Sequence, residues 1–236
     1  MAVALITGAS RGIGAATARL FAEAGFDLLL LARSSAQLSS LVAELRARGR
    51  RVEATNLDLG DPAAVQPGLL ELCGRGLAPS VVINNAGAAW TGPLAEMPLE
   101  SWQGLMQVNL TSMFQVCQAL LPQLRHQGGG LILNVSSHAA SNAFPGWGAY
   151  CASKAAVVAF SRCLAEEERI HGIRVGTLTL GSVNTPLWDS DTVDSSFDRR
   201  AMLSAEQAAA ALLFMAQQPS NQFVEDLTLK PAVGTF

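Results

Sequence analysis

The stretch VALITGASRGIG, residues 3–14, joins a short apolar run to a loop that contains three glycines. The run at 3–6 is typical of a strand buried on both faces, and a helical spacing of apolar residues begins at about Gly12. Glycine permits a tight turn and a close approach of the backbone, so a pyrophosphate can lie at the helix N-terminus. The glycine spacing is G-x3-G-x-G, but the order strand, loop, helix is that of dinucleotide-binding units. We therefore predict the first unit of an α/β fold that binds a dinucleotide.

The rest of the chain repeats this alternation of apolar strands and helices. Strands are predicted at 3–6, 27–32, 51–57, 80–84, 131–136, 173–180 and 226–229. Helices are predicted at about 12–24, 35–48, from 61 onward, 99–126 with a bend near Pro122, 148–169 and 204–217. Strands that are apolar on both faces and alternate with helices indicate a parallel sheet covered on both sides. The predicted fold class is α/β: a single doubly wound parallel seven-stranded sheet flanked by helices, a Rossmann fold, in one domain over 1–236.

The composition argues against several other classes of protein. Of 236 residues, 50% are hydrophobic and 15% charged, which fits a large buried sheet. No apolar run reaches about 18 residues and the N-terminus lacks the basic start of a signal peptide, so we expect a cytoplasmic protein without a membrane span. The net charge of −3 gives no reason to expect a nucleic acid partner. The cysteines have no metal spacing, so we expect no metal and reduced thiols at Cys73, Cys117, Cys151 and Cys163.

Several sequence features together carry a resemblance to a known family. They are TGASRGIG (7–14), NNAG (84–87), Asn109, Ser137 and the pair Tyr150-x3-Lys154. In their order and spacing, over nearly the whole chain, these features resemble the short-chain dehydrogenase/reductase family, in particular its NADPH-dependent carbonyl and 3-oxoacyl reductases. The resemblance implies a Rossmann fold, a nicotinamide cofactor and hydride transfer between that cofactor and a small carbonyl or alcohol substrate.

The resemblance assigns catalytic roles to Asn109, Ser137, Tyr150 and Lys154. Tyr150 is the only tyrosine, and Lys154, four residues later, lies on the same helix face. The neighbouring ammonium is expected to lower the pKa of the phenol, which would donate a proton in reduction and accept one in oxidation. Ser137 would hold the substrate oxygen, and Asn109 would position a water beside Lys154. The alternatives are a core aromatic role for Tyr150 and a bracing role for Asn109.

Basic residues near the first loop decide the expected cofactor. In the family an acidic residue at the end of the second strand selects NAD, but that position is Ala32 here, followed by Arg33, and Arg11 lies in the glycine loop. Arginine binds a 2′-phosphate well, so NADPH is predicted; the alternative is that both arginines are solvated surface charges. For Asn84 we prefer a role in bracing the sheet. The predicted cofactor-binding residues are Gly8, Ser10, Arg11, Gly12, Ile13, Gly14, Arg33, Asp58, Leu59, Asn85, Ala86, Gly87, Tyr150, Lys154, Val183 and Thr185.

The segments after the fourth, fifth and sixth strands are expected to form the substrate pocket, because ligands bind at the carboxyl ends of parallel strands. Such a mainly aromatic mouth suits a hydrophobic ketone or aldehyde. The alternative is that some of these side chains pack in the core or at a subunit contact. The polar segment at 187–200 is predicted to be a small mobile lid. The predicted pocket residues are Trp90, His138, Phe144, Trp147 and Trp188.

Three functions stay open from the sequence. The first is an NADPH-dependent carbonyl reductase. The second is a 3-oxoacyl-[acyl-carrier-protein] reductase, although glycines at 128–130 and His-Gly at 171–172 replace the basic residues expected there. The third is a non-catalytic NADPH-sensing regulator, which the retained Tyr and Lys disfavour. The resemblance also implies a homodimer or homotetramer paired through the helices at 99–126 and 148–169.

Overall fold

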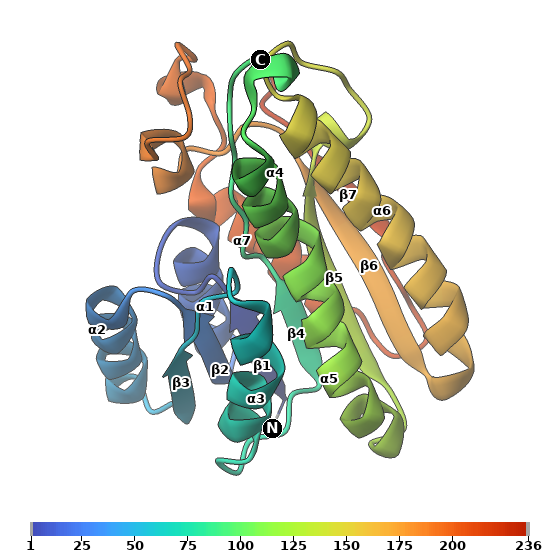
Figure 1. The fold of residues 1–236 in the computed structure, drawn as a ribbon. Helices are drawn as coiled ribbons and strands as arrows, with labels where there is room; N and C mark the ends of the chain where they lie inside the picture. The colour runs from blue at the N-terminus through green and yellow to red at the C-terminus, as the bar shows by residue number, and fades with distance from the viewer. Residues whose placement is uncertain (1, 235–236) are drawn as a thin grey trace.

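The computed structural model describes residues 2–234 and contains one seven-stranded sheet in which all neighbouring strands are parallel. The strand order is β3-β2-β1-β4-β5-β6-β7, so the chain winds outward from β1 to one edge and then from β4 to the other (Figure 1). The predicted doubly wound fold is thereby confirmed. Residues 1 and 235–236 of the predicted domain lie outside the described residues. The strands are β1 Val3–Thr7, β2 Asp27–Ala32, β3 Val52–Asn56, β4 Val81–Asn84, β5 Gly130–Ser137, β6 Ile173–Leu180 and β7 Asp226–Leu229.

Helices cover both faces of this sheet. They are α1 Gly12–Glu23, α2 Ser35–Ala47, α3 Pro62–Cys73, α4 Leu99–Met106, α5 Ser112–His126, α6 Gly148–Glu168 and α7 Ala205–Ala216. One buried cluster joins the sheet to α1, α2 and α7, and a second cluster joins the opposite face to α3, α5 and α6. Figure 1 shows α4, α5 and α6 in front of the strands. The molecule is therefore a three-layer sandwich of helices, sheet and helices.

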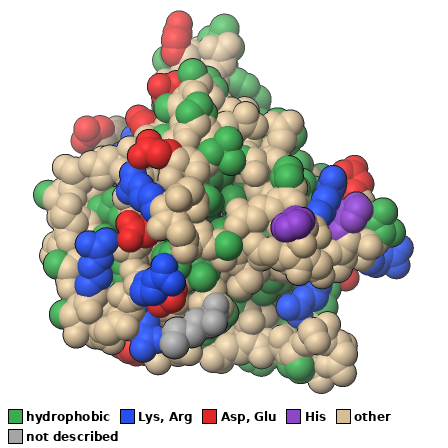
Figure 2. Space-filling view, turned by 90° about the horizontal axis from the view of Figure 1, so that it is seen from below, with side chains coloured by type: hydrophobic (Ala, Val, Ile, Leu, Met, Phe, Trp, Pro, Cys, Tyr) green, Lys and Arg blue, Asp and Glu red, His purple; other side chains and the backbone are tan. Residues whose placement is uncertain are grey.

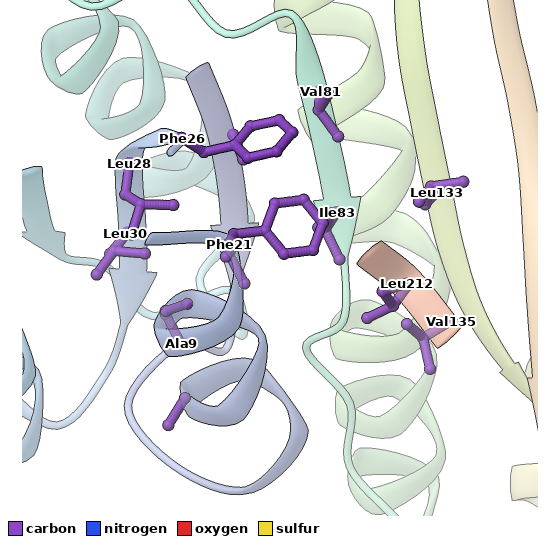
Figure 3. Packing of buried hydrophobic residues seen from close by; sticks show 14 of the residues in the cluster. Ala9, Phe21, Phe26, Leu28, Leu30, Val81, Ile83, Leu133, Val135 and Leu212 are labelled. Atoms are coloured by element: carbon purple, nitrogen blue, oxygen red, sulfur yellow. The ribbon is translucent and has the colours of Figure 1, made fainter. Parts of the chain in front are cut away.

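Alternate residues of each central strand enter the two cores. In β1, Ala4 and Ile6 belong to the cluster under α1 and α7, whereas Leu5 belongs to the cluster under α3 and α5. Figure 3 shows the first of these clusters, in which the ring centres of Phe21 and Phe26 lie 4.8 Å apart. Because both faces are buried, β1, β2 and β4 are apolar at nearly every position. This continuous apolarity is what made them recognisable as short runs in the sequence.

The single helix predicted over 99–126 is wrong in one respect, because it is divided. A π-helical turn at Gln107–Thr111 separates α4 from α5, and the helix continues through Pro122. Asn109 lies in this turn, where its Oδ1 accepts the Ala88 N–H at 2.7 Å and its Nδ2 donates to the Ala88 carbonyl at 3.0 Å. Binding of this side chain to the loop after β4 accounts for an irregular turn here, and π-helical turns are frequent at functional sites.

The underside of the molecule, opposite the carboxyl ends of the strands, carries mixed charges. Figure 2 views this side and shows Lys and Arg side chains beside Asp and Glu. The turn between α2 and β3 is an example, because Arg46 lies 3.8 Å from Glu53 and Arg48 lies 2.6 Å from Glu23. Because charges of both signs lie close together, the net electrostatic potential on this side is small and attracts an anionic partner weakly. Within residues 2–234, every helix is too short or too polar to span a bilayer.

Candidate active site

A cavity of about 720 Å³ opens at the carboxyl ends of the strands. It extends from the glycine loop after β1, past the ends of β2, β4 and β5, to the segment after β6. Three predicted site residues, Gly14, Trp90 and Asn109, do not line it. The predicted residues that do line it are Gly8, Ser10, Arg11, Gly12, Ile13, Arg33, Asp58, Leu59, Asn85, Ala86, Gly87, Ser137, His138, Phe144, Trp147, Tyr150, Lys154, Val183, Thr185 and Trp188.

The glycine loop packs too closely for side chains at two of its positions. A Cβ on Gly14 would lie 2.2 Å from the Gly8 carbonyl oxygen, and a Cβ on Gly8 would lie 2.9 Å from Ala86 Cα. Gly8 also has a φ of +66°, a backbone conformation that disfavours other residues. Gly14 therefore shapes the loop from beneath and does not contact the cavity.

The N-terminus of α1 lies at this loop without a side-chain cap. Arg11 holds the N-cap position, but its side chain makes no capping hydrogen bond, and the first turn has no acidic residue. The first N–H groups of a helix have no partner inside the helix. Together with the helix dipole, these free donors fit the pyrophosphate of a dinucleotide.

The two asparagines of NNAG have different roles. Asn84 Nδ2 donates to Asn134 Oδ1 at 2.9 Å, which joins β4 to β5 and confirms the expected bracing role. Asn85 Nδ2 donates to the Thr7 carbonyl at 3.0 Å, and Thr7 Oγ1 accepts the N–H groups of Asn85 and Ala86, each at 3.0 Å. Asn85 thus fixes the end of β4 to the glycine loop, so its side chain holds the cavity wall in place.

Two positively charged side chains stand where the cavity passes the end of β2. Arg11 and Arg33 are exposed and line the cavity, and their guanidinium groups form no ion pair or hydrogen bond with any other residue of the described chain. The strand ends at Ala32 with no acidic residue. Asp58 Oδ1 accepts the Gly60 N–H at 2.8 Å and thereby shapes a turn on the same side. Two unpaired guanidinium groups fit the 2′-phosphate of an NADP molecule.

Ser137, Tyr150 and Lys154 line the cavity together, at the end of β5 and in the first turns of α6. Lys154 is 4% exposed. Its Nζ donates to the Val135 carbonyl at 3.0 Å and lies 5.8 Å from the centre of the Tyr150 ring. Burial lowers the pKa of Lys154 to about 8. At neutral pH the ammonium is still the main form, so a positive charge lies beside the phenol.

The direction expected for the pKa of Tyr150 is wrong. Burial of the phenol raises its pKa above the usual value of 10, and a hydrogen bond with Ser137 acts in the opposite direction but is outweighed. The ammonium of Lys154, engaged by the Val135 carbonyl, does not compensate for the lost solvation. Tyr150 is therefore a protonated phenol at neutral pH, which is the form that can donate a proton.

Asn109 braces the walls of the site from behind. Besides its two bonds with Ala88, its Nδ2 donates to Ser153 Oγ on α6 at 2.9 Å. A Cβ on Gly87 would lie 3.5 Å from Asn109 Oδ1 and 3.6 Å from Lys154 Nζ, so both side chains approach the same glycine. This geometry agrees with the alternative role considered for Asn109, that of a structural brace. Its role in positioning a water beside Lys154 stays a prediction.

A row of aromatic rings, here called the aromatic wall, lines the cavity beyond Tyr150. The ring centres of Tyr150 and Trp147 lie 5.6 Å apart, those of Trp147 and Trp188 also 5.6 Å, and those of Trp188 and Phe197 5.7 Å. Trp188 Nε1 donates to the Val183 carbonyl at 2.8 Å, which fixes its indole. The wall, Trp147, Trp188 and Phe197, gives this part of the cavity an apolar surface.

The predicted pocket differs from the observed one in a few residues. The indole of Trp90 packs over Gly92, where a Cβ would lie 2.6 Å from the ring, and Trp90 does not line the cavity. Sequence reasoning missed several lining residues. Phe197 could have been found as an aromatic residue inside a polar segment, and Ser182 as part of the segment after the sixth strand, whereas Gln37 and Val108 follow no pattern. The missed residues include Gln37, Val108, Ser182 and Phe197.

The segment at 187–200 closes one side of the cavity through defined contacts. Thr192 Oγ1 donates to the Ala89 carbonyl at 2.7 Å, which ties the segment to the loop after β4. Arg199 Nε donates to Asn184 Oδ1 at 2.8 Å, which ties it to the loop after β6. The mobility expected of this lid stays a prediction.

Comparison with known proteins supports the family that the motifs indicate. A sequence model of the short chain dehydrogenase family matches residues 2–195. D-threitol dehydrogenase of Mycolicibacterium smegmatis is 33% identical over 221 residues, which are 91% of this chain and 85% of that protein. A 3-oxoacyl-[acyl-carrier-protein] reductase of Synechocystis sp. is 30% identical over 230 residues, which are 96% and 93% of the two chains. The structure of an alcohol dehydrogenase from Thermococcus sibiricus, complexed with 5-hydroxy-NADP, has a TM-score of 0.90 at 30% identity and covers 99% of this chain and 98% of that one.

The chain therefore belongs to the short-chain dehydrogenase/reductase family, and the predicted family and Rossmann fold are confirmed. Members of this family are oxidoreductases. The NADP analogue held by the solved alcohol dehydrogenase agrees with the cofactor predicted from Arg11 and Arg33.

Proposed function

We propose that this protein is an NADPH-dependent oxidoreductase that reduces a ketone or aldehyde of mainly hydrophobic character to an alcohol. One observation carries the proposal: Ser137, Tyr150 and Lys154 line the same cavity as the glycine loop and the unpaired Arg11 and Arg33. A dinucleotide bound along the loop and a carbonyl compound bound at Tyr150 would share this space. The aromatic wall favours an apolar substrate.

The residues of the cavity fit NADPH, which supplies the hydride when it is bound. Arg11 and Arg33 would hold the 2′-phosphate, and the open N-terminus of α1 would hold the pyrophosphate. Lys154 would bond the nicotinamide ribose. The loop after β6, with Val183 and Thr185, would hold the carboxamide end.

In the proposed reduction, Tyr150 donates a proton to the carbonyl oxygen of the substrate. Its raised pKa keeps the phenol protonated at neutral pH until the substrate oxygen becomes basic. Lys154 then stabilises the phenolate that remains, because its ammonium is buried beside the ring. Ser137 would hold the same substrate oxygen by its hydroxyl and stabilise the negative charge that develops there.

The test is the loss of NADPH absorbance in the presence of a panel of apolar ketones and aldehydes. We expect turnover of at least one carbonyl compound and a clear preference for NADPH over NADH. Tight NADPH binding without turnover of any carbonyl compound would support the non-catalytic regulator instead. A preference for NADH would contradict the roles given to Arg11 and Arg33.

A second candidate function is 3-oxoacyl-[acyl-carrier-protein] reduction, which the similarity to the Synechocystis reductase favours. The basic side chains near the expected docking positions are already engaged. Arg125 pairs with the buried Glu168, and Arg169 lies 3.0 Å from Glu166. A carrier protein is acidic, so paired arginines attract it weakly. Equal kcat/KM for a carrier-linked 3-oxoacyl group and the matching small thioester would exclude a role for the carrier.

We also propose that the protein pairs with itself through α4, α5 and α6. Apolar side chains stay exposed on these helices: Leu99 is 64% exposed and Phe114 is 43% exposed. The rings of Phe114 and Phe160 meet edge to face, with centres 6.3 Å apart, and so join α5 to α6 in one apolar surface. Light scattering should report a dimer or tetramer, and a monomer would contradict this arrangement.

A further inference from the structure

A hydrogen bond ties the loop after β3 to the π-helical turn between α4 and α5. Gln107 Nε2 donates to the Leu59 carbonyl at 3.0 Å, across 48 positions of the chain. The same Nε2 donates to Gln115 Oε1 at 3.2 Å, and Gln115 Nε2 donates to the Pro62 carbonyl at 2.8 Å. Because a backbone carbonyl only accepts, these contacts fix the orientation of both side-chain amides. Two glutamines therefore hold the loop after β3 at Leu59 and at Pro62.

The loop after β3 lies at the end of the cavity that is proposed to hold the adenosine half of NADPH. Asp58 and Leu59 line the cavity. The Leu57 N–H donates to the Ala32 carbonyl at 3.1 Å, directly before Arg33, which is proposed to hold the 2′-phosphate. Neighbouring carbons of one ribose carry the adenine and the 2′-phosphate, so the base would lie against this loop. The exposed Asp58 carboxylate can accept a hydrogen bond from the adenine amino group.

The turn that carries Gln107 also reaches the reaction side of the cavity. Val108, the next residue, lines the cavity. The residue after it, Asn109, donates from Nδ2 to Ser153 Oγ at 2.9 Å, and Ser153 directly precedes Lys154 on α6. Three successive residues thus contact the adenosine end, the cavity wall and the helix of the reaction side. This turn therefore fixes the two ends of the cavity relative to each other.

We propose that Gln107 is a positioning residue for the adenine of NADPH: its amide holds the Leu59 carbonyl and thereby keeps the Asp58 carboxylate in place for the adenine amino group. This inference rests on the cofactor binding in the proposed function and adds a residue that does not itself line the cavity. Gln107 acts through the loop and does not touch the cofactor. When its amide is removed, the loop after β3 loses its tie to the π-helical turn, and the amino group loses an oriented acceptor.

The experiment compares NADPH with an analogue in which purine replaces adenine, so that hydrogen stands in place of the amino group. We expect the wild-type dissociation constant, measured by calorimetry, to be about tenfold higher for the analogue, because a hydrogen bond to a charged group is lost. In Gln107→Met the ratio of the two constants should fall to within about twofold, because NADPH then binds more weakly. The control is Gln66→Met, which removes an amide that donates to Gln118 Oε1 at 2.6 Å between α3 and α5. This control should keep the wild-type ratio.

A second variant and a second readout separate positioning from a structural role. Gln107→Glu keeps the shape of the side chain, but a carboxylate cannot donate to the Leu59 carbonyl, so the ratio should fall as in Gln107→Met. The added charge acts equally on both cofactors and cancels in the ratio. The kcat at saturating NADPH should stay within about twofold in both variants, because only cofactor binding is changed.

Three results would overturn this inference and leave the reductase function intact. They are a wild-type ratio near one, a ratio that is unchanged in both Gln107 variants, and an equal fall of the ratio in Gln66→Met. A larger loss of kcat would assign Gln107 to the structure of the reaction side and would overturn it as well. If no ketone or aldehyde oxidises NADPH, the proposed function itself fails, whereas the two dissociation constants still test the role of Gln107.

Discussion

Arg11 and Arg33, on the side of the cavity beside β1 and β2, are exposed, whereas Lys154, on the side beside β5 and α6, is 4% exposed. Water and salt weaken the field of the exposed arginines, so they contribute to binding without perturbing chemistry. The Nζ of the buried lysine lies 5.8 Å from the centre of the Tyr150 ring, and burial lowers the pKa of Lys154 to about 8. The comparison teaches that recognition of the cofactor's 2′-phosphate and reactivity come from separate environments. Substitutions on the two sides should therefore change different constants.

The largest effect is expected on the buried side. Tyr150→Phe removes the proton donor and keeps the ring that contacts Trp147. We expect kcat to fall about 10³-fold, because general acid catalysis contributes about 10²–10⁴-fold. The dissociation constant of NADPH, measured by fluorescence, should change far less than kcat, since Arg11, Arg33 and Lys154, which are proposed to hold the cofactor, are all retained. A variant as fast as the wild type would show that Tyr150 is not the acid.

On the exposed side, Arg11→Ala/Arg33→Ala should raise the KM for NADPH about 100-fold, because two charge-assisted bonds are lost. The KM for NADH and the kcat should stay nearly constant. The matched control is Arg50→Ala/Arg51→Ala, which removes the same charge at the other end of the sheet. An equal effect of this control would mean that the response is only to net charge.

The burial of the Lys154 charge should be visible in how the free energy of unfolding depends on pH. Burial holds the pKa of Lys154 at about 8 when folded, against 10.5 when exposed, so between these values the unfolded chain binds more protons and stability rises with pH. Lys154→Met has no such group. The free energy of unfolding of Lys154→Met minus that of the wild type should therefore decrease by about 2 kcal/mol from pH 8 to pH 10, because only the wild type gains stability from this group.

Urea unfolding of the wild type and of Lys154→Met, without dinucleotide and at pH 8 and pH 10, gives the free energies of unfolding that are compared. The thiols of Cys73 and Cys117, whose pKa values burial raises to about 11 and about 12, titrate in both proteins and cancel in the difference. A constant advantage across this range would mean that Lys154 is solvated in the folded protein.

The smallest effect is expected from salt. Raising the ionic strength from about 0.05 M to about 0.5 M shortens the Debye length severalfold, so the KM for NADPH should rise about threefold. The kcat should stay within about twofold, because the charge of Lys154 is buried and Tyr150 carries no charge in its protonated form. A kcat that follows the salt concentration as steeply as the KM would show that the reaction side is open to water.

Local sequence was enough to predict the order and type of nearly all elements, because the central strands, buried on both faces, are almost continuously apolar. It also predicted the residues whose spacing is local, such as the glycine loop and the Tyr150–Lys154 pair. It failed at the break between α4 and α5, because that break depends on a bond from Asn109 to the backbone of Ala88, 21 residues away in the chain. It failed at Trp90, because the direction of a loop side chain is not periodic.

The sequence by itself determined the fold, the family and the chemical groups available, since apolar periodicity and motif spacing are properties of neighbouring residues. Only the tertiary structure decided the direction of the pKa shift of Tyr150, the bond from Gln107 to the Leu59 carbonyl, and the composition of the aromatic wall. Each of these depends on how much water is excluded and on which distant group lies opposite. Desolvation and long-range pairing exist only once the chain is packed.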